Sequence, residues 1–407
     1  MSESTRSQHL YLAKINERHV LGVIRDHGPS SRADVVRHSG LSAPTVSKAA
    51  ASLQRARLLE EVEGNGQVIG RPAMKLRLAT ASAQVLGVVI DVNRSWVVAT
   101  GLDGELCEKR THRIDTVSDY DDLIDALVTH ARSLMEHSGA RTLGIGVTVP
   151  GLIDHRRGLD ILSPNVHVID GRSPGRDLAE RLGVECMMIQ DQHALCMAER
   201  YFGNARGLDD FAILDVSSGV GMGVMSGGRL VRGHSGFAGE IGHITVTPGG
   251  RRCGCGNRGC LETVASDTAL AKQVSRRLGR QIDIDELIRL TRAGKLDPQE
   301  ECKEVVHYLA IGLATVINIF NPSTLFIHGQ LFDVDRRLFA RVLDQTRKRT
   351  LAPSFADCRI IRAHGSKRQG AVAGVIQHLI DSVVPELHSS EIPRSPSRRG
   401  KAAGTDQ

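Results

Sequence analysis

The sequence lacks the segments that direct a protein into or across a membrane. The first twenty residues are polar and contain no apolar stretch of the kind that signal peptides carry. The longest nearly apolar run, residues 305–320, includes His307 and Asn318 and is short for a membrane span, which indicates a buried helix. We therefore expect a soluble, cytoplasmic protein with no membrane partner.

Composition excludes several other classes of protein. The 42 glycines follow no Gly-X-Y period, and a hydrophobic content of 41% is too high for a largely disordered chain. The eight cysteines of a cytosolic protein are not expected to form disulfides. At about 100 to 200 residues per domain, the 407 residues predict two or three domains with ample core.

The net charge of +6 is concentrated near the N-terminus. Residues 1–80 carry 12 Lys or Arg against 7 Asp or Glu, residues 384–407 carry 4 against 3, and residues 81–383 are balanced at 36 against 36. A basic head on a neutral body is typical of a DNA-binding domain joined to a sensing or catalytic one. Ordinary surface charge explains the excess equally well, so charge alone does not distinguish a DNA-binding domain from any other basic segment.

The basic segment has the pattern of a winged helix-turn-helix. An apolar helical stripe ends at 27–29, His-Gly-Pro, and a short helix after Ser31 leads to a tight turn at 39–41. Ser42 can cap the next helix, and residues 58–78 alternate like a hairpin, which would form the wing. Small outward side chains let the second helix of the motif approach the major groove, and basic ones reach phosphates. The candidate DNA-contacting residues are Ser42, Pro44, Thr45, Ser47, Lys48 and Arg71. A module for dimerisation or protein contact is the alternative.

After residue 80, buried strands alternate with helices, which predicts an α/β body with mixed sheets. Strands are expected near 85–90, 143–149, 186–189 and 325–328, and helices near 121–137, 283–293 and 304–320. Residues 389–407 are rich in Ser, Pro, Arg and Gly, which is typical of a disordered tail.

Four potential metal ligands lie close together in the sequence. His243, Cys253, Cys255 and Cys260 form a closed Cys₃His set, which suits a tetrahedral structural Zn²⁺, and the glycines between them allow a tight loop. A catalytic zinc is disfavoured because four protein ligands leave no open position. A redox or merely buried cysteine cluster is the alternative.

Other polar residues and a glycine-rich turn are candidates for binding a sugar or a phosphate. Glu240, Glu262 and Asp191 offer carboxylates that can accept hydroxyl hydrogen bonds in a sugar site, although acids far apart in sequence are more often solvated. The glycine-rich turn at 217–223 can present backbone N–H groups to a phosphate, and a plain hairpin explains it equally well.

Taken together, these residues resemble the ROK family, which groups repressors, open reading frames and sugar kinases. The resemblance covers about residues 10–383. The most specific motif is 253–262, Cys-Gly-Cys-Gly-Asn-Arg-Gly-Cys-Leu-Glu. The others are 149–151 (Val-Pro-Gly) with Asp154, 163–165 (Ser-Pro-Asn), Asp191 with Glu199 and Gly203, and 239–243 (Gly-Glu-Ile-Gly-His).

The resemblance implies an actin-like ATPase (sugar kinase-like) body of two α/β lobes with a sugar cleft between them. The domains would be a winged helix-turn-helix at 1–80, a first lobe at 81–190, a second lobe with the zinc loop at 191–320, a segment returning to the first lobe at 321–383, and a disordered tail at 384–407.

The resemblance also implies roles for individual residues. Asn165, Glu240, His243 and Glu262 occupy sugar-contacting positions, and Asp191 falls on the general base of the family's kinases. His243 would also ligate zinc, so the metal would orient the sugar site.

Departures from the kinase pattern indicate which branch of the family applies. Kinases carry Asp-x-Gly-Gly-Thr where residues 91–95 read Asp-Val-Asn-Arg-Ser, so close phosphate approach should be blocked. Ser218 replaces a usual Thr, 328–330 (His-Gly-Gln) replaces a Gly-Gly pair, and Gln190 and His193 replace asparagines beside Asp191. The family's repressors lack the phosphate loop, keep the sugar cleft and carry an additional winged helix. This sequence has the same pattern.

We therefore expect a regulator and not an enzyme. It would repress carbohydrate uptake or catabolism genes by binding a double-stranded operator as a homodimer or homotetramer, and a sugar, sugar phosphate or protein effector would modulate it. Two other interpretations stay open, namely an ATP-dependent sugar kinase with an accessory DNA-binding head and a regulator that senses zinc.

Overall fold

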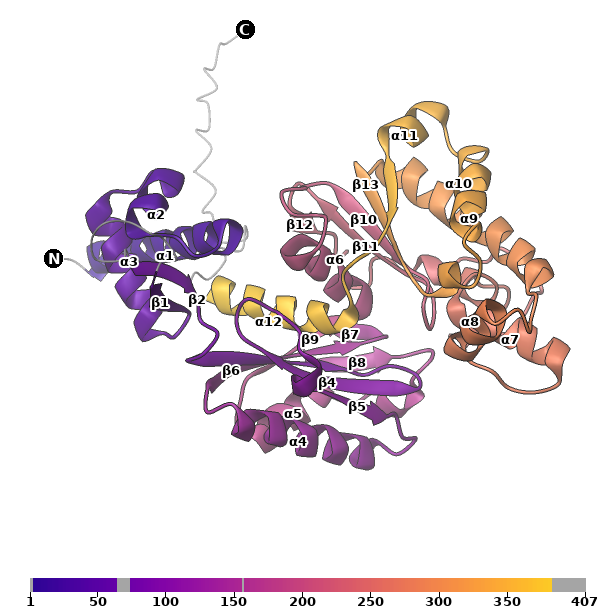
Figure 1. Ribbon diagram of the computed structural model, residues 1–407, viewed down its shortest axis with the longest axis horizontal. Coiled ribbons are helices and arrows are strands. Elements are labelled where there is room, and N and C mark those ends of the chain that lie inside the picture. The colour runs from indigo at the N-terminus through magenta and orange to yellow at the C-terminus, as the bar shows by residue number, and fades with distance from the viewer. Residues whose placement is uncertain (1–2, 64–73, 156, 383–407) are drawn as a thin grey trace, which may run out of the picture.

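The computed structural model describes residues 3–63, 74–155 and 157–382, which form an N-terminal head and a body of two lobes (Figure 1). Arg71 of the predicted wing and the predicted tail at 384–407 lie outside the described residues. Within them, the α/β body preceded by a winged helix-turn-helix is confirmed.

Capping residues in the sequence fix where the helices of the head begin and end. It contains α1 (Glu3–His27), α2 (Arg32–Ser39), α3 (Ala43–Arg55) and the antiparallel strands β1 (Leu59–Glu63) and β2 (Met74–Leu78). Ser31 and Asp34 cap each other reciprocally at the start of α2, and Gly40 ends that helix at φ 68°, a left-handed conformation that glycine adopts freely. The Ser42 side chain accepts a hydrogen bond from the Thr45 N–H and so fixes where α3 begins.

The two lobes of the body contain sheets of the same topology. The first sheet has the order β5-β4-β3-β6-β9 and the second the order β12-β11-β10-β13-β14. In each, three antiparallel strands in hairpin succession are followed by two parallel ones. The strands are β3 (Ala83–Val89), β4 (Arg94–Thr100), β5 (Thr111–Asp115), β6 (Arg141–Val149) and β9 (Cys186–Gln190) in the first, and β10 (Phe211–Asp215), β11 (Gly221–Ser226), β12 (Arg229–Leu230), β13 (Thr324–His328) and β14 (Arg359–Arg362) in the second.

Helices cover both sheets (Figure 1). On the first, α4 (Tyr120–His137) and α5 (Pro174–Leu182) lie on one face, and α12 (Lys367–Ser382) lies on the other and packs against α6 (Asp191–Phe202). The second lobe carries α7 (Asp267–Leu278), α8 (Ile284–Arg292), α9 (Gln299–Phe320), α10 (Leu338–Arg347) and α11 (Ala352–Asp357). A short hairpin, β7 (Leu152–Asp154) with β8 (Leu159–Leu162), projects after β6.

Helix α9 accounts for the most apolar stretch of the sequence. By length and composition it is the one helix among the described residues that could cross a membrane, yet half of its apolar window is buried inside the protein. Val305, Leu309 and Leu313 are fully buried and pack with β10 and β13 in the core of the second lobe. The prediction of a buried helix is therefore confirmed.

One predicted boundary is wrong. Residues 321–383 were expected to return to the first lobe, but β13 pairs in parallel with β10 and β14 pairs with β13, so both complete the second sheet. Within this segment α12 alone packs on the first sheet, against β3 and β6.

The head and the body share one hydrophobic core. Val20, Ile24 and Leu76 of the head pack in the same buried cluster as Val372 and Ile376 of α12. The outer end of this contact is tied by an ion pair of 2.8 Å between Arg18 and Asp381. The head is therefore seated on α12 rather than suspended on a free linker.

Candidate functional site

The predicted DNA-contacting residues lie at the start of α3. Val46, Ala49, Ala50 and Leu53 face the core of the head, which leaves Pro44, Ser47 and Lys48 exposed on the opposite face. Thr45 is half-buried, and its hydroxyl lies 2.8 Å from that of the exposed Ser42. The first turns of α3 thus present small polar groups and one cation.

In the body, side chains with reactive chemistry gather where strands end. Asp91 follows β3, Asp191 follows β9, Asp215 ends β10 and His328 ends β13. Because these four strands run parallel to partners within their sheets, their carboxyl ends meet at one edge of each lobe, where α/β proteins bind ligands. The two edges face each other across the cleft between the lobes.

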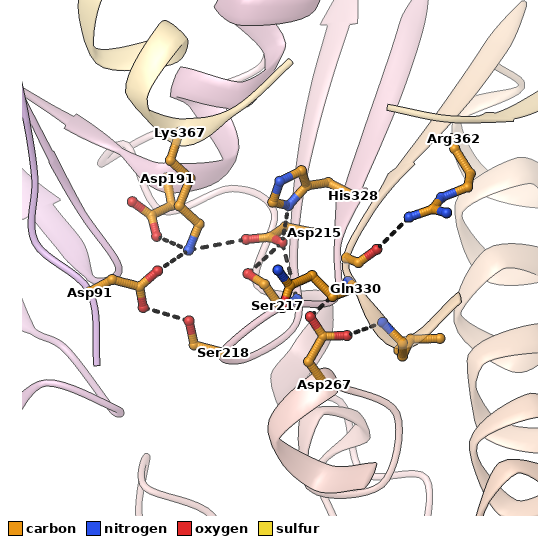
Figure 2. Close-up of polar contacts among 12 residues, drawn as sticks. Asp91, Asp191, Asp215, Ser217, Ser218, Asp267, His328, Gln330, Arg362 and Lys367 are labelled. Atoms are coloured by element: carbon orange, nitrogen blue, oxygen red, sulfur yellow. Dashed lines mark hydrogen bonds and ion pairs between the residues drawn. The ribbon is translucent and has the colours of Figure 1, made fainter. Parts of the chain in front are cut away.

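A lysine occupies the centre of this edge (Figure 2). The Lys367 ammonium lies 2.6 Å from an oxygen of Asp191, 2.9 Å from one of Asp91 and 3.5 Å from one of Asp215. Asp91 also accepts a hydrogen bond from the Ser218 hydroxyl of the second lobe, and Asp215 lies 2.8 Å from Nδ1 of His328. Lys367 was not among the site residues predicted from the sequence, since nothing next to it in the chain marks it.

Burial and charge shift the pKa values of this cluster in opposite directions. Burial lowers the pKa of Lys367, but the three surrounding carboxylates outweigh it and hold that pKa well above its usual value. Burial raises the pKa of Asp191 to about 6 against the opposing attraction of Lys367. For Asp215, Lys367 and His328 outweigh burial and keep the pKa well below its usual value. At neutral pH the cluster therefore holds an ammonium among carboxylates.

The five predicted sugar-contacting residues line a single cavity. Asn165 comes from the first lobe, Asp191 from the start of α6, and Glu240, His243 and Glu262 from the loops of the second lobe. The Asn165 amide donates to Glu262 at 3.4 Å, and Gln192 donates to Glu240 at 3.3 Å. The cavity has a volume of about 50 Å³ and continues to Lys367.

The four predicted metal ligands also come together. One ligand atom from each of His243, Cys253, Cys255 and Cys260 lies within 4.8 Å of the others. Nδ1 of His243 is 3.6 Å from the Cys253 sulfur, while its Nε2 is 3.7 Å from a carboxylate oxygen of Glu240. Three thiols and one imidazole in this arrangement fit a tetrahedral metal ion such as Zn²⁺.

Close backbone contacts join the metal loop to the sugar residues. A Cβ on Gly259 would lie 1.8 Å from the Thr247 carbonyl oxygen, so only glycine fits within the loop. A Cβ on Gly254 would lie 2.0 Å from the carbonyl oxygen of Pro164, the residue before Asn165. The loop therefore packs directly against the first lobe beside the cavity.

Comparison with known families agrees with this architecture. A family model described as the ROK family matches residues 86–380. The chain belongs to the ROK family. In this ROK protein a second model, described as the MarR family, matches residues 14–67, which correspond to the head.

Individual relatives of this ROK protein include regulators and kinases. The chain is 28% identical over 383 residues to the xylose repressor of Bacillus spizizenii, covering 92% of this chain and 98% of that one. It is similar to a solved ROK family transcriptional regulator, a homolog of the E. coli MLC protein, with a TM-score of 0.76 and 26% identity over 92% of this chain and 98% of that one. It is also similar to a ROK family glucokinase from Streptomyces griseus, solved with glucose and AMPPNP, with a TM-score of 0.61 and 25% identity over 71% and 97% of the two chains.

Proposed function

We propose that this protein is a sugar-responsive transcriptional repressor of carbohydrate uptake or catabolism genes. The observation that carries the proposal is the convergence of Asn165, Asp191, Glu240, His243 and Glu262 on one cavity, in a body whose core is shared with a DNA-binding head. The repressor names of relatives that span both head and body support it. In the head, Ser42, Pro44, Thr45, Ser47, Lys48 and Arg71 would contact operator DNA.

Sugar binding would require the lobes to move. A cavity of about 50 Å³ is far smaller than the roughly 300–1,000 Å³ of a typical small-molecule pocket, so a sugar would have to separate some of the groups that line it. Helices α6 and α12 both begin at this cavity, with Asp191 and Lys367, and both end at the head. At the head end, Ile376 and Tyr201 are buried in the shared core, and the Arg25 guanidinium lies 4.9 Å from the Tyr201 ring centre. Lobe movement would therefore reach the DNA-contacting surface.

The Cys₃His cluster would hold a structural zinc ion. The ion would be bound by Nδ1 of His243 and the three thiolates, which fixes the imidazole so that Nε2 faces Glu240. Metal bound in this way would shape the sugar site without taking part in chemistry. A role as the regulatory signal is disfavoured, because a closed four-ligand site with two buried cysteines stabilises a fold.

The kinase alternative is disfavoured by the first strand turn. Asn93 and Arg94 stand where the family's kinases have two glycines, and the Arg94 guanidinium is 2.8 Å from Asp285 of the second lobe. Two bulky side chains at this turn would obstruct the close approach of phosphates to its backbone. We therefore propose that the protein is not an enzyme.

As a repressor it would act in the cytoplasm. It would bind palindromic DNA as a homodimer or homotetramer, because a two-fold protein matches a two-fold operator.

A panel of ligands tests this function. We expect one sugar or sugar phosphate among glucose, xylose, N-acetylglucosamine and their phosphates to raise the melting temperature of the zinc-loaded protein by a few degrees, since a ligand at 100 times its Kd adds about 2.7 kcal/mol. ATP with Mg²⁺ should leave the melting temperature unchanged. A shift with ATP would favour the kinase, and no shift with any sugar would direct the search to a protein effector.

A further inference from the structure

Lys367 is an unusual residue to find buried where it is. Its side chain is 9% exposed and it is the first residue of α12, where the partial positive charge of a helix N-terminus disfavours a cation. The first turn of α12 contains no acidic residue to offset this. The carboxylates that compensate it come from elsewhere in the chain, with Asp91 lying 276 residues away.

The three carboxylates belong to both lobes. Asp91 follows the first strand of the first sheet, and Asp215 ends the equivalent first strand of the second sheet. Lys367 bridges them, and Ser218, just after Asp215, donates directly to Asp91 (Figure 2). A single ammonium thus links the facing edges of the two lobes.

Such a set of oxygens is suited to a divalent cation as well as to an ammonium. Mg²⁺ and Mn²⁺ prefer carboxylate ligands, and in phosphoryl transfer these ions sit between carboxylates and nucleotide phosphates. Oδ1 of Asp191, which is 4% exposed, has no hydrogen-bond partner among the described residues, so the set retains coordinating capacity. The similar S. griseus glucokinase was solved with AMPPNP, whereas here an amino acid side chain fills the acidic edge.

We propose that Lys367 is an internal substitute for the metal–nucleotide of a kinase-like cleft. Its ammonium offsets part of the negative charge of Asp91, Asp191 and Asp215, holds the lobes together without a nucleotide and keeps divalent cations out. This deepens the proposed function, on which it rests, because it leaves sugar as the ligand to which the lobes respond.

The test replaces Lys367 and measures Mn²⁺ binding to the full-length, zinc-loaded chain. Lys367→Ala removes the charge and opens space among the three carboxylates. We expect this variant to bind one more equivalent of Mn²⁺ than the parent does, with a Kd on the order of 10⁻⁴ M, the weak end of carboxylate sites for divalent cations. Mn²⁺ at 1 mM, about ten times this Kd, should raise the melting temperature of Lys367→Ala by about 2 °C more than that of the parent.

Controls isolate the cation effect. Lys348→Ala removes an exposed lysine that pairs with Asp344 and should bind Mn²⁺ as the parent does. Lys367→Arg keeps the positive charge and should also gain no site, while Asp215→Asn added to Lys367→Ala should abolish the gain. If Lys367→Ala folds only in Mn²⁺, and not in sodium chloride of equal ionic strength, the proposal is supported.

Contrary outcomes are equally clear. A folded Lys367→Ala chain that gains no Mn²⁺ site, or an unfolded one that Mn²⁺ fails to restore, would overturn the proposal. These readouts use neither DNA nor sugar, so they can fail while operator binding and sugar response succeed, and the reverse also holds.

Discussion

Replacing Cys260 by serine is expected to abolish zinc binding and to weaken sugar binding by about 100-fold. Cys260 is fully buried and precedes Leu261 and Glu262, so losing its thiolate frees the segment that carries one sugar contact. His243 would lose the ion that orients its ring. Two charge-assisted hydrogen bonds lost at about 1.5 kcal/mol each give about 3 kcal/mol, or about 100-fold in Kd.

The measurement combines zinc content with calorimetric titration of the sugar that the ligand panel selects. Cys107→Ser is a matched control, because Cys107 is exposed and lies outside the metal cluster. It should keep both zinc and sugar affinity. A Cys260→Ser chain that retained one zinc per chain and normal affinity would show that the cluster does not hold the metal as proposed.

Replacing Ser47 by glutamate is expected to weaken operator binding by at least about 100-fold, because placing like charges together at an interface costs several kcal/mol. Ser47 is exposed on α3 on the face opposite Val46 and Ala50, so the change should leave the core of the head intact. Melting temperature and sugar affinity should stay at the values of the parent.

Fluorescence anisotropy with a labelled duplex measures this effect. Thr129→Glu adds the same charge at an exposed position of α4 in the body and should reduce DNA affinity only slightly. Equal losses in the two variants would mean that net charge alone matters and that α3 is not the recognition helix.

The features predicted correctly from the sequence are those determined by residues close together in the chain. The helix caps at Ser31 and Ser42 bond to residues three positions ahead, and the metal ligands lie within 18 residues, so local spacing determines both. Asn165 and His243 were predicted to contact sugar by resemblance alone, whereas the three acids were candidates from their chemistry as well. All five lie on one cavity.

What the sequence did not reveal depends on long-range pairing. Lys367 acquires its role from Asp91, Asp191 and Asp215, and no local pattern marks a lysine that such distant carboxylates will surround. The assignment of 321–383 failed for the same reason, since a short apolar strand such as β13 can pair in parallel with a strand of either lobe. Parallel partners are set by the packing of the whole lobe.

The most direct test of the account measures operator affinity with and without sugar. A duplex is first selected from a random pool by the full-length, zinc-loaded protein, and its Kd is then determined by anisotropy at fixed salt while each sugar is added. We predict that the sugar that stabilises the protein weakens operator binding about 10- to 100-fold, and that the operator weakens sugar binding by the same factor, because the coupling between sites is reciprocal. A sugar that binds the cleft without changing operator affinity would contradict the account.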